Sequence, residues 1–381
     1  MIYFDNAATT PSLPEVVSSF VKANRDYFAN SESNHAVGLK SSRALEEARF
    51  SFLHLLGVEK SHNLVFTSGA SEANNLALKG TAIRYQNRGK RILVSPVEHP
   101  SVNQPLKELA DYFGFRIEKL PIDSYGRVRT DALASLMDKE TILVSVMAVN
   151  NELGSMNDIA SIAKFVHQFP KCFFHVDATQ AMGKVKLPYE EVDLLSFSAH
   201  KFGGLKGNGG LIYKKTMSFL PLVAGGEQEN GIRAGTVNVA GNIAMVKAFE
   251  IATMNLKKNY DNALAIYDYL YDYFSSGPTQ YAVHSDKIGL FQTPFVLNVG
   301  FKKKKASVIV EALSNHDVYV SSVSACSTKE IHASPTLLAC GYSLEEASNS
   351  IRISFGAENT LEEAHTFTSV LDEVMKEVID R

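Results

Sequence analysis

The sequence predicts an α/β protein in which helices cover a mostly parallel sheet, followed by a smaller α+β unit. Three observations lead to this prediction. The chain has 381 residues, 45% hydrophobic and 21% charged, which is enough apolar material for about two domains. Short apolar runs alternate with longer helical patterns through the first half of the chain. This alternation stops near residue 245.

Five apolar runs predict the strands of the sheet. They begin at residues 64, 91, 141, 173 and 194 and read LVFTSG, RILVSPVEH, TILVSVMAVNNELG, FFHVDATQ and LLSFSAHKF. Helical patterns separate the runs, so we expect parallel βαβ units in which both faces of the sheet are covered.

The pattern of the second half indicates a different architecture. The long helical stretch AMVKAFEIATMNLKKNYDNALAIYDYLYDYF precedes strand signals at FVLNVGF and SIRISFG. We therefore predict a large domain over residues 16–245. Residues 1–15 and 246–381 should form a small α+β domain, joined by the N-terminal arm.

Charge and cysteine content exclude several classes of protein. Lys and Arg total 38 against 41 Asp and Glu, and this net charge of −3 does not attract nucleic acid or an anionic membrane. The start, MIYFDNAATTP, does not resemble a signal peptide, and no later apolar run is long enough to span a bilayer. Cys172, Cys326 and Cys340 fit neither a disulfide framework nor a metal-binding pattern. We expect a cytoplasmic protein with free thiols and no metal.

Polar residues follow the predicted strands at their carboxyl ends. Ligands of open parallel sheets bind outside these ends, where side chains that are distant in sequence meet. One crevice is therefore expected to collect Ser68, His99, Asn151, Asp177 and His200.

The stretch SFSAHKFGG at 196–204 places Lys201 directly after one of these strands. A lysine there is usually a surface residue whose stem covers apolar atoms. Here, however, Ser198, His200 and the following glycines supply the donors that a phosphate needs. A second anion site is predicted at TSGASEANN, 67–75, where a helix begins after a glycine; it is neither a Walker A loop nor a GxGxxG loop. These features suggest a cofactor that carries both a phosphate and an aldehyde.

Pyridoxal 5′-phosphate is such a cofactor, and it also needs a carboxylate at its ring nitrogen. Asp177, in HVDATQ, ends a predicted strand and precedes Lys201 by 24 residues (201 − 177). Alone, Asp177 would be read as a helix cap. Together with Lys201, Gln180 and the phosphate donors, it favours the cofactor interpretation.

At this point the chain resembles the NifS-like cysteine desulfurases, which are fold type I pyridoxal phosphate enzymes of class V. The resemblance covers nearly the whole chain and rests on many motifs in the family's order: YFDNAATT, FTSGASEANN, VEHPSV, NNELG, HVDATQ, SFSAHKFGG, GIRAGT, SSVSAC and SIRISFG. It implies a large domain with a mostly parallel seven-stranded sheet, a smaller α+β domain, and a homodimer.

The resemblance also implies roles for individual residues. Lys201 would bind the cofactor aldehyde, Asp177 would pair with the ring nitrogen, and His99 would stack on the ring. Because an unperturbed imidazole titrates at about 6.5, we also expect His99 to shuttle protons. Two residues would lie near the phenolic oxygen: Gln180 and Asn151. The phosphate would be held by Ala70, Ser71, Ser198, His200 and, from the neighbouring subunit, Thr236. The substrate carboxylate would be bound by Arg352 with help from Asn151.

One segment departs from the family pattern. Where HGGGxERG is usual, residues 224–231 read AGGEQENG, with differences at Ala224, Glu227 and Asn230. These differences affect the expected loop geometry and dimer contacts rather than the cofactor. Ser71 replaces the common threonine and keeps its hydroxyl group.

Of the three cysteines, Cys326 is the candidate nucleophile. Cys172 and Cys340 stand in apolar surroundings typical of inert buried thiols. The neighbours of Cys326, in SSVSACSTKEIHASP, are small and polar and predict a surface loop. The resemblance places the family's persulfide-forming cysteine at this position. The number of residues between Cys326 and the Arg352 region also resembles that of the family's long-loop subgroup.

The expected function is therefore a cysteine desulfurase, a sulfurtransferase that converts L-cysteine to L-alanine. The sulfur would pass as a persulfide on Cys326 to an acceptor protein in iron–sulfur or thiolation pathways. Two alternatives stay open at this point: an aminotransferase or lyase of the same fold, and an interaction scaffold that has lost its chemistry.

Overall fold

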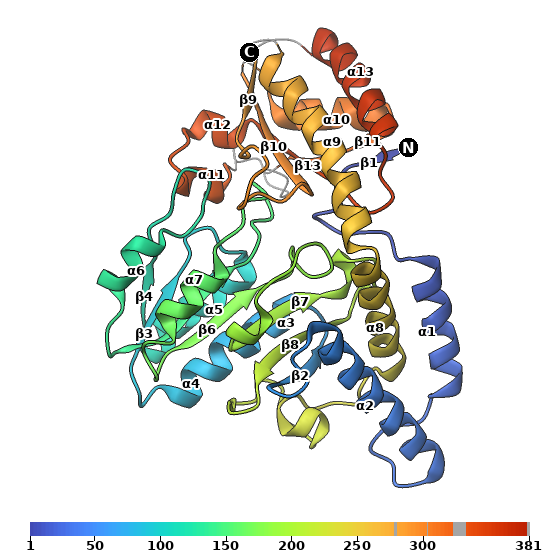
Figure 1. The fold of residues 1–381 in the computed structure, drawn as a ribbon, viewed down its shortest axis with the longest axis vertical. Coiled ribbons are helices and arrows are strands. Elements are labelled where there is room, and N and C mark those ends of the chain that lie inside the picture. Colours follow the sequence, from blue (N-terminus) through green and yellow to red (C-terminus); the bar gives the residue numbers. More distant parts are fainter. Residues whose placement is uncertain (278–279, 303, 323–332, 379–381) are drawn as a thin grey trace.

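A seven-stranded mixed sheet forms the centre of the larger body of the protein (Figure 1). The computed structural model describes residues 1–277, 280–302, 304–322 and 333–378. Strand β8 is antiparallel to both of its neighbours, and the other adjacent pairs are parallel, so the predicted mostly parallel sheet is confirmed. In spatial order the strands are β2 (His62–Thr67), β8 (Gly209–Lys214), β7 (Leu194–Ser198), β6 (Phe173–Asp177), β5 (Thr141–Met147), β3 (Arg91–Val94) and β4 (Arg116–Lys119).

The five predicted apolar runs correspond to β2, β3, β5, β6 and β7. All seven residues of β5 are buried, as expected of a strand that is covered on both faces. Two strands have no counterpart among the predicted runs. Strand β4, RIEK, is a charged edge strand, and β8 begins with two glycines, so neither shows the apolar pattern of a central strand.

Successive residues of a strand point to opposite faces of the sheet, and both faces of this sheet are apolar, so helices pack on both. Leu195 belongs to one core cluster with residues of α2, α7 and α8, whereas Leu194 belongs to another with residues of α3 and α5. On the first face, Phe52 stacks between Phe197 and Phe249, with ring centroids 4.8 and 4.5 Å away. The helices around the sheet are α1 (Pro14–Asp26), α2 (Ala36–Leu56), α3 (Ala70–Asn75), α4 (Thr81–Tyr85), α5 (Pro100–Phe113), α6 (Thr130–Leu136), α7 (Ile159–Val166) and α8 (Val239–Met254).

The smaller body contains a four-stranded sheet in the order β12-β13-β10-β9. The strand signals FVLNVGF and SIRISFG correspond to β10 and β13 and are confirmed. The strands are β9 (Tyr281–Val283), β10 (Val296–Phe301), β12 (Ser321–Ser322) and β13 (Ser350–Ser354). The helices are α9 (Leu256–Ser276), α10 (Ala306–Asn315), α11 (Pro335–Ala339), α12 (Leu344–Ser348) and α13 (Leu361–Glu377).

The N-terminal arm belongs to the packing of this smaller body. Strand β1 (Ile2–Tyr3) pairs in parallel with β11 (Val318–Tyr319), and Phe4 is fully buried in the same core cluster as α9, β10 and β13. The predicted long helical stretch is divided at Asn255 into α8 and α9, which follow one another in Figure 1. The domain boundary at residues 245 and 246 stays a prediction. Within the described part of the chain, no helix is both long and apolar enough to cross a membrane.

Candidate active site

A cavity of about 670 Å³ opens at the edge of the large sheet where its parallel strands end. All five residues predicted to converge on one crevice line it: Ser68, His99, Asn151, Asp177 and His200. Residues 7–9 of the N-terminal arm and Arg352 of β13 complete its wall. The cavity is therefore lined by residues at the carboxyl ends of strands in the larger body and by residues of the N-terminal arm and β13.

Lys201 lies in a short turn that follows β7. Its Nζ donates hydrogen bonds to the carbonyl oxygens of Ala7 and Ala8, at 2.6 and 2.7 Å. Burial lowers the pKa of this amine to about 8, and the nearby positive charge of Arg352 contributes to the decrease. Roughly one Lys201 in 11 is therefore neutral at pH 7, far more than for an ordinary lysine, and a nucleophile or base must be neutral.

Asp177 is the last residue of β6 and is only 5% exposed. Its Oδ1 accepts the backbone N–H of Thr179 at 2.9 Å, and its Oδ2 accepts the side-chain amide of Asn74 at 2.8 Å. The first bond stabilises the turn after the strand, as a capping carboxylate would. The second fixes the carboxylate from α3, on a different element of the fold.

His99 precedes α5 and caps its first turn. Its Nδ1 accepts the backbone N–H of Ser101 at 3.1 Å, so the neutral ring carries its proton on Nε2. Burial lowers the pKa of this imidazole below its ordinary value. The Asn74 amide that holds Asp177 also donates to the Ser101 hydroxyl at 2.9 Å. Asn74 and Ser101 thus connect His99 to Asp177, and neither was among the predicted site residues.

The predicted phosphate donors gather where β2 and β7 end. Gly69, at the start of α3, has a φ of 153°, and a Cβ on the facing Gly209 would lie 2.6 Å from its Cα. Glycine is therefore required at 209 by the close approach of the two backbones and at 69 by its positive φ. The cavity is lined here by Ala70, Ser71, Ser198 and His200. Burial, followed by the charge of Lys201, lowers the pKa of His200 to about 4, so this ring is neutral and acts through hydrogen bonding.

Gln180 lies between the N-terminal arm and a buried lysine. Its Nε2 donates to the Ala7 carbonyl at 2.9 Å, and its Oε1 accepts from Lys184 Nζ at 3.3 Å. Lys184 is 7% exposed, and burial together with the charges of Lys201 and Arg352 lowers its pKa to about 7. Lys184 was not predicted as a site residue, although GK follows HVDATQAM directly in the sequence.

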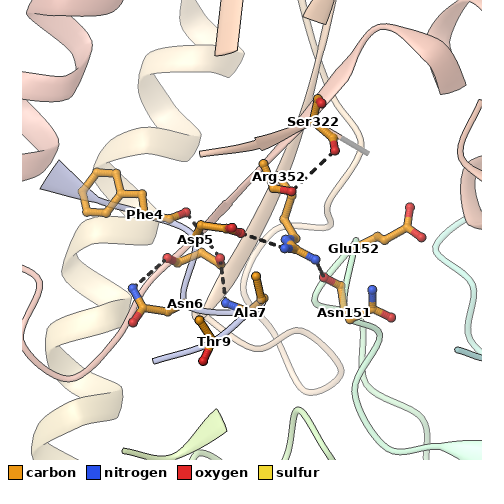
Figure 2. Close-up of polar contacts among 12 residues, drawn as sticks. Phe4, Asp5, Asn6, Ala7, Thr9, Asn151, Glu152, Ser322 and Arg352 are labelled. Carbon is orange, nitrogen blue, oxygen red and sulfur yellow. Dashed lines mark hydrogen bonds and ion pairs between the residues drawn. The ribbon is translucent and has the colours of Figure 1, made fainter. Parts of the chain in front are cut away.

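Arg352 of β13 lines the cavity, and Figure 2 shows its guanidinium directed toward Asp5 and Asn151. Its Nη2 donates to Asp5 Oδ1 at 2.8 Å and its Nη1 donates to the carbonyl oxygen of Asn151 at 3.2 Å. The guanidinium thus lies between the N-terminal arm and the segment after β5. Asp5 belongs to the YFDNAATT motif, but it was not predicted to take part in the site.

Two predicted residues are not placed in the cavity. Thr236 is exposed and does not line the cavity within the described part of the chain, so its role toward a neighbouring subunit stays a prediction. Cys326 lies outside the described residues. Burial raises the pKa of the Cys340 thiol to about 12 and that of the more deeply buried Cys172 thiol further. Both are therefore poor nucleophiles at neutral pH.

The segment that departs from the family pattern is held by a buried ion pair. Glu229 Oε2 accepts from Arg49 Nη1 at 2.8 Å and from the Phe66 backbone N–H at 3.0 Å. The next residue, Asn230, has a φ of 56°, which asparagine tolerates better than arginine does. Ala224 and Glu227 are exposed. Asn230 therefore suits its backbone, whereas Glu229, with a φ of 50°, is held in a strained conformation by its buried bonds.

No group of three or more His, Cys, Asp or Glu side chains is arranged to hold a metal ion among residues 1–277, 280–302, 304–322 and 333–378.

Comparison with known proteins identifies the family of the chain. Residues 2–367 match the family described as Aminotransferase class-V. A protein of Lactobacillus delbrueckii subsp. bulgaricus, named NifS/IcsS protein homolog, is 37% identical over 98% of this chain and 97% of its own length. The protein named cysteine desulfurase IscS of Dictyoglomus turgidum is 36% identical over 99% of this chain and 95% of its own.

Solved structures agree with this relationship. A NifS-like protein superimposes with a TM-score of 0.91 at 32% identity and covers 99% of this chain and 100% of its own. A NifS-like protein from Rickettsia africae gives a TM-score of 0.87 at 26% identity, with 99% of both chains covered. These structures confirm the fold that the resemblance implied. The chain belongs to the class-V aminotransferase family.

Proposed function

We propose that this protein is a pyridoxal phosphate-dependent cysteine desulfurase. The observation that carries the proposal is the placement of Lys201, Asp177 and Arg352 around one cavity, which offers an amine, a buried carboxylate and a guanidinium to one small molecule. The similarity over nearly the full chain to proteins named cysteine desulfurase favours desulfuration over transamination. Lys201 and Asp177 would serve an aminotransferase of this fold equally well, so the choice between the two activities rests on that similarity and on Cys326.

The side chains around the cavity fit the cofactor. Hydroxyl groups of Ser71 and Ser198 stand near the glycine turn, where a phosphate finds donors, and Asp177 is held ready to accept a ring N–H. The Thr179 hydroxyl is buried and has no partner among the described residues, so it can bond a ligand. When bound, pyridoxal phosphate supplies an aldehyde for the substrate amine and a protonated ring that withdraws electrons from Cα.

The chain itself supplies binding and proton transfer. Arg352 can bind the carboxylate of L-cysteine at two points, which fixes the Cα–H bond relative to Lys201. With a pKa of about 8, the Lys201 amine can accept the Cα proton at its Nζ and return it later. His99 holds a proton on Nε2 and is the proposed second proton carrier.

Cys326 would perform the sulfur step. Its thiolate attacks the substrate sulfur and breaks the bond between that sulfur and Cβ, so L-cysteine and the Cys326 thiol become L-alanine and a Cys326 persulfide. The substrate carbon is reduced and the two sulfurs share the oxidation, so the step needs no external oxidant. The terminal sulfur then passes to an acceptor protein. We also propose that the enzyme is a cytoplasmic homodimer in which Thr236 reaches the partner's phosphate site.

The test is product analysis with L-cysteine as the sole substrate. We expect alanine, and we expect one additional sulfur on the peptide that contains Cys326, removable by dithiothreitol. The Cys326→Ala variant should bind the cofactor and produce no alanine. Stoichiometric formation of a keto acid and the amine form of the cofactor would instead identify an aminotransferase. A persulfide on Cys172 or Cys340 would refute the assignment of Cys326.

A further inference from the structure

Arg352 is held by an acidic residue that does not itself line the cavity in the described part of the chain. Asp5 Oδ1 lies 2.8 Å from Arg352 Nη2, and the two side chains are 22% and 11% exposed. In Figure 2 the guanidinium lies between Asp5 and Asn151. Such a partly buried, charge-assisted hydrogen bond is stronger than an exposed ion pair.

The position of Asp5 is fixed independently of Arg352. Its backbone bridges to Ser354, and the following residue, Asn6, is 3% exposed and donates through Nδ2 to Asn359 Oδ1 at 3.0 Å. The preceding residue, Phe4, is fully buried in the core of the smaller body. Because its neighbours are anchored, Asp5 can impose an orientation on the guanidinium.

The hydrogen bonds of the guanidinium show what that orientation leaves free. An arginine has five N–H groups, two on each terminal nitrogen and one on Nε. Nη2 donates one N–H to Asp5, and Nη1 donates one N–H to the Asn151 carbonyl. Nε is buried and has no partner among the described residues. One N–H on each terminal nitrogen therefore remains for a carboxylate, which is the number that two-point binding needs.

Asp5 also offsets positive charge in this region. Lys201 and Lys206 line the cavity with Arg352. Lys184 lies close enough for the charges of Lys201 and Arg352 to lower its pKa. Without Asp5 the guanidinium would lose its charged acceptor and keep the bond to the Asn151 carbonyl.

We propose that Asp5 is a positioning residue that holds Arg352 in the orientation in which it binds the substrate carboxylate. The proposal rests on the proposed function, in which Arg352 binds that carboxylate. Asp5 should govern substrate affinity far more than the chemical step, because it contacts Arg352 directly and affects Lys201 only through its charge. Loss of one charge-assisted hydrogen bond weakens binding by about tenfold or more.

The experiment compares Asp5→Ala, Asp5→Asn and Arg352→Ala with the unmodified holoenzyme. Steady-state kinetics with L-cysteine give KM and kcat, and calorimetry gives the Kd of 3-mercaptopropionate, which has the thiol and carboxylate of cysteine but no amine. We expect Asp5→Ala to raise both KM and this Kd by about tenfold with kcat within about twofold of the unmodified value. Asp5→Asn keeps an acceptor at the same place and should recover part of the affinity.

The matched control is Asp26→Ala, which removes the carboxylate of an exposed Asp–Arg pair on α1, with Arg25 78% and Asp26 31% exposed. It should change neither constant. If Arg352→Ala loses affinity for 3-mercaptopropionate while Asp5→Ala keeps it, or binds more tightly, the positioning role is overturned. If Asp5→Ala does not fold, Asp5→Leu, which has a similar size and no acceptor, overturns it equally when its Kd is unchanged. An unmodified enzyme that releases no alanine from cysteine refutes the proposed function instead, and the calorimetric comparison still decides the role of Asp5.

Discussion

The reactivity of Lys201 provides a quantitative test of the electrostatics of the site. Burial, together with the charge of Arg352, lowers the pKa of this amine to about 8, whereas Asp177 and Asp5 oppose the decrease. The ordinary value of a lysine is 10.5. Removing a positive neighbour should therefore raise the pKa, and removing a negative neighbour should lower it.

The two pKa values, about 8 and 10.5, determine how much burial increases the neutral, reactive fraction of the amine. At pH 7, an amine with a pKa of about 8 is neutral in roughly one molecule in 11, whereas an amine with a pKa of 10.5 is neutral in roughly one in 3,000. The reactive fraction thus differs by roughly 300-fold. Because partial burial also slows a reagent, the pH at which labelling reaches half its maximum is a better measure than the rate itself.

The assay is competitive labelling of the cofactor-free protein with trace acetic anhydride between pH 6 and 11, read for each lysine peptide by mass spectrometry. We expect a midpoint near 8 for Lys201, a higher midpoint in Arg352→Met and a lower one in Asp5→Asn. The exposed Lys22 serves as an internal reference in every sample. A Lys201 midpoint near 10.5, or shifts of the same sign in both variants, would refute this account of the charges.

Two further predictions concern buried side chains. Lys184→Met should stabilise the protein, because burial lowers the pKa of Lys184 from 10.5 to about 7 in the folded state. The free-energy cost of burying this lysine is therefore full below pH 7 and decreases to nothing as the pH rises to 10.5. The substitution should therefore raise the melting temperature more at pH 6 than at pH 9. Turnover should decrease, because Gln180 loses its partner. An equal rise in melting temperature at both pH values would contradict the reasoning. Phe52→Ala should lower the free energy of unfolding by about 3–5 kcal/mol in urea titrations, since it leaves a cavity between Phe197 and Phe249, whereas Phe50→Ala, on the exposed side of α2, should cost far less.

The parts of the site that follow strands were predictable from sequence. Asp177 and Ser198 each end a buried strand, and Lys201 follows three residues after Ser198. Local apolar patterns fix where these strands end, and the parallel arrangement brings their ends to one edge. The cavity could therefore be predicted without knowing any contact between distant residues.

The residues that hold these site residues in place, Asn74, Asp5 and Lys184, could not be predicted from local sequence patterns. Asn74 reaches Asp177 across 103 positions in sequence, and Asp5 reaches Arg352 across 347. No local period or spacing encodes such contacts, because they arise only when α3 and the N-terminal arm pack against other elements. Lys184 was missed for a different reason: a lysine after a strand is usually exposed, and only packing shows that this one is buried.

The N-terminal arm connects the two halves of the proposed chemistry. Arg352 stands on β13, whose residues pack in the core of the smaller body, whereas Lys201 follows β7 in the core of the larger one. The arm contacts both: Asp5 binds the guanidinium, and the carbonyls of Ala7 and Ala8 bind the lysine amine. Since the substrate must be held by Arg352 and deprotonated by Lys201, the distance between these groups decides whether a bound amino acid can react. A displacement of the arm would therefore change the contacts of Arg352 and of Lys201 together, whereas the loss of the Asp5 carboxylate alone would leave the bonds from Lys201 to Ala7 and Ala8 in place.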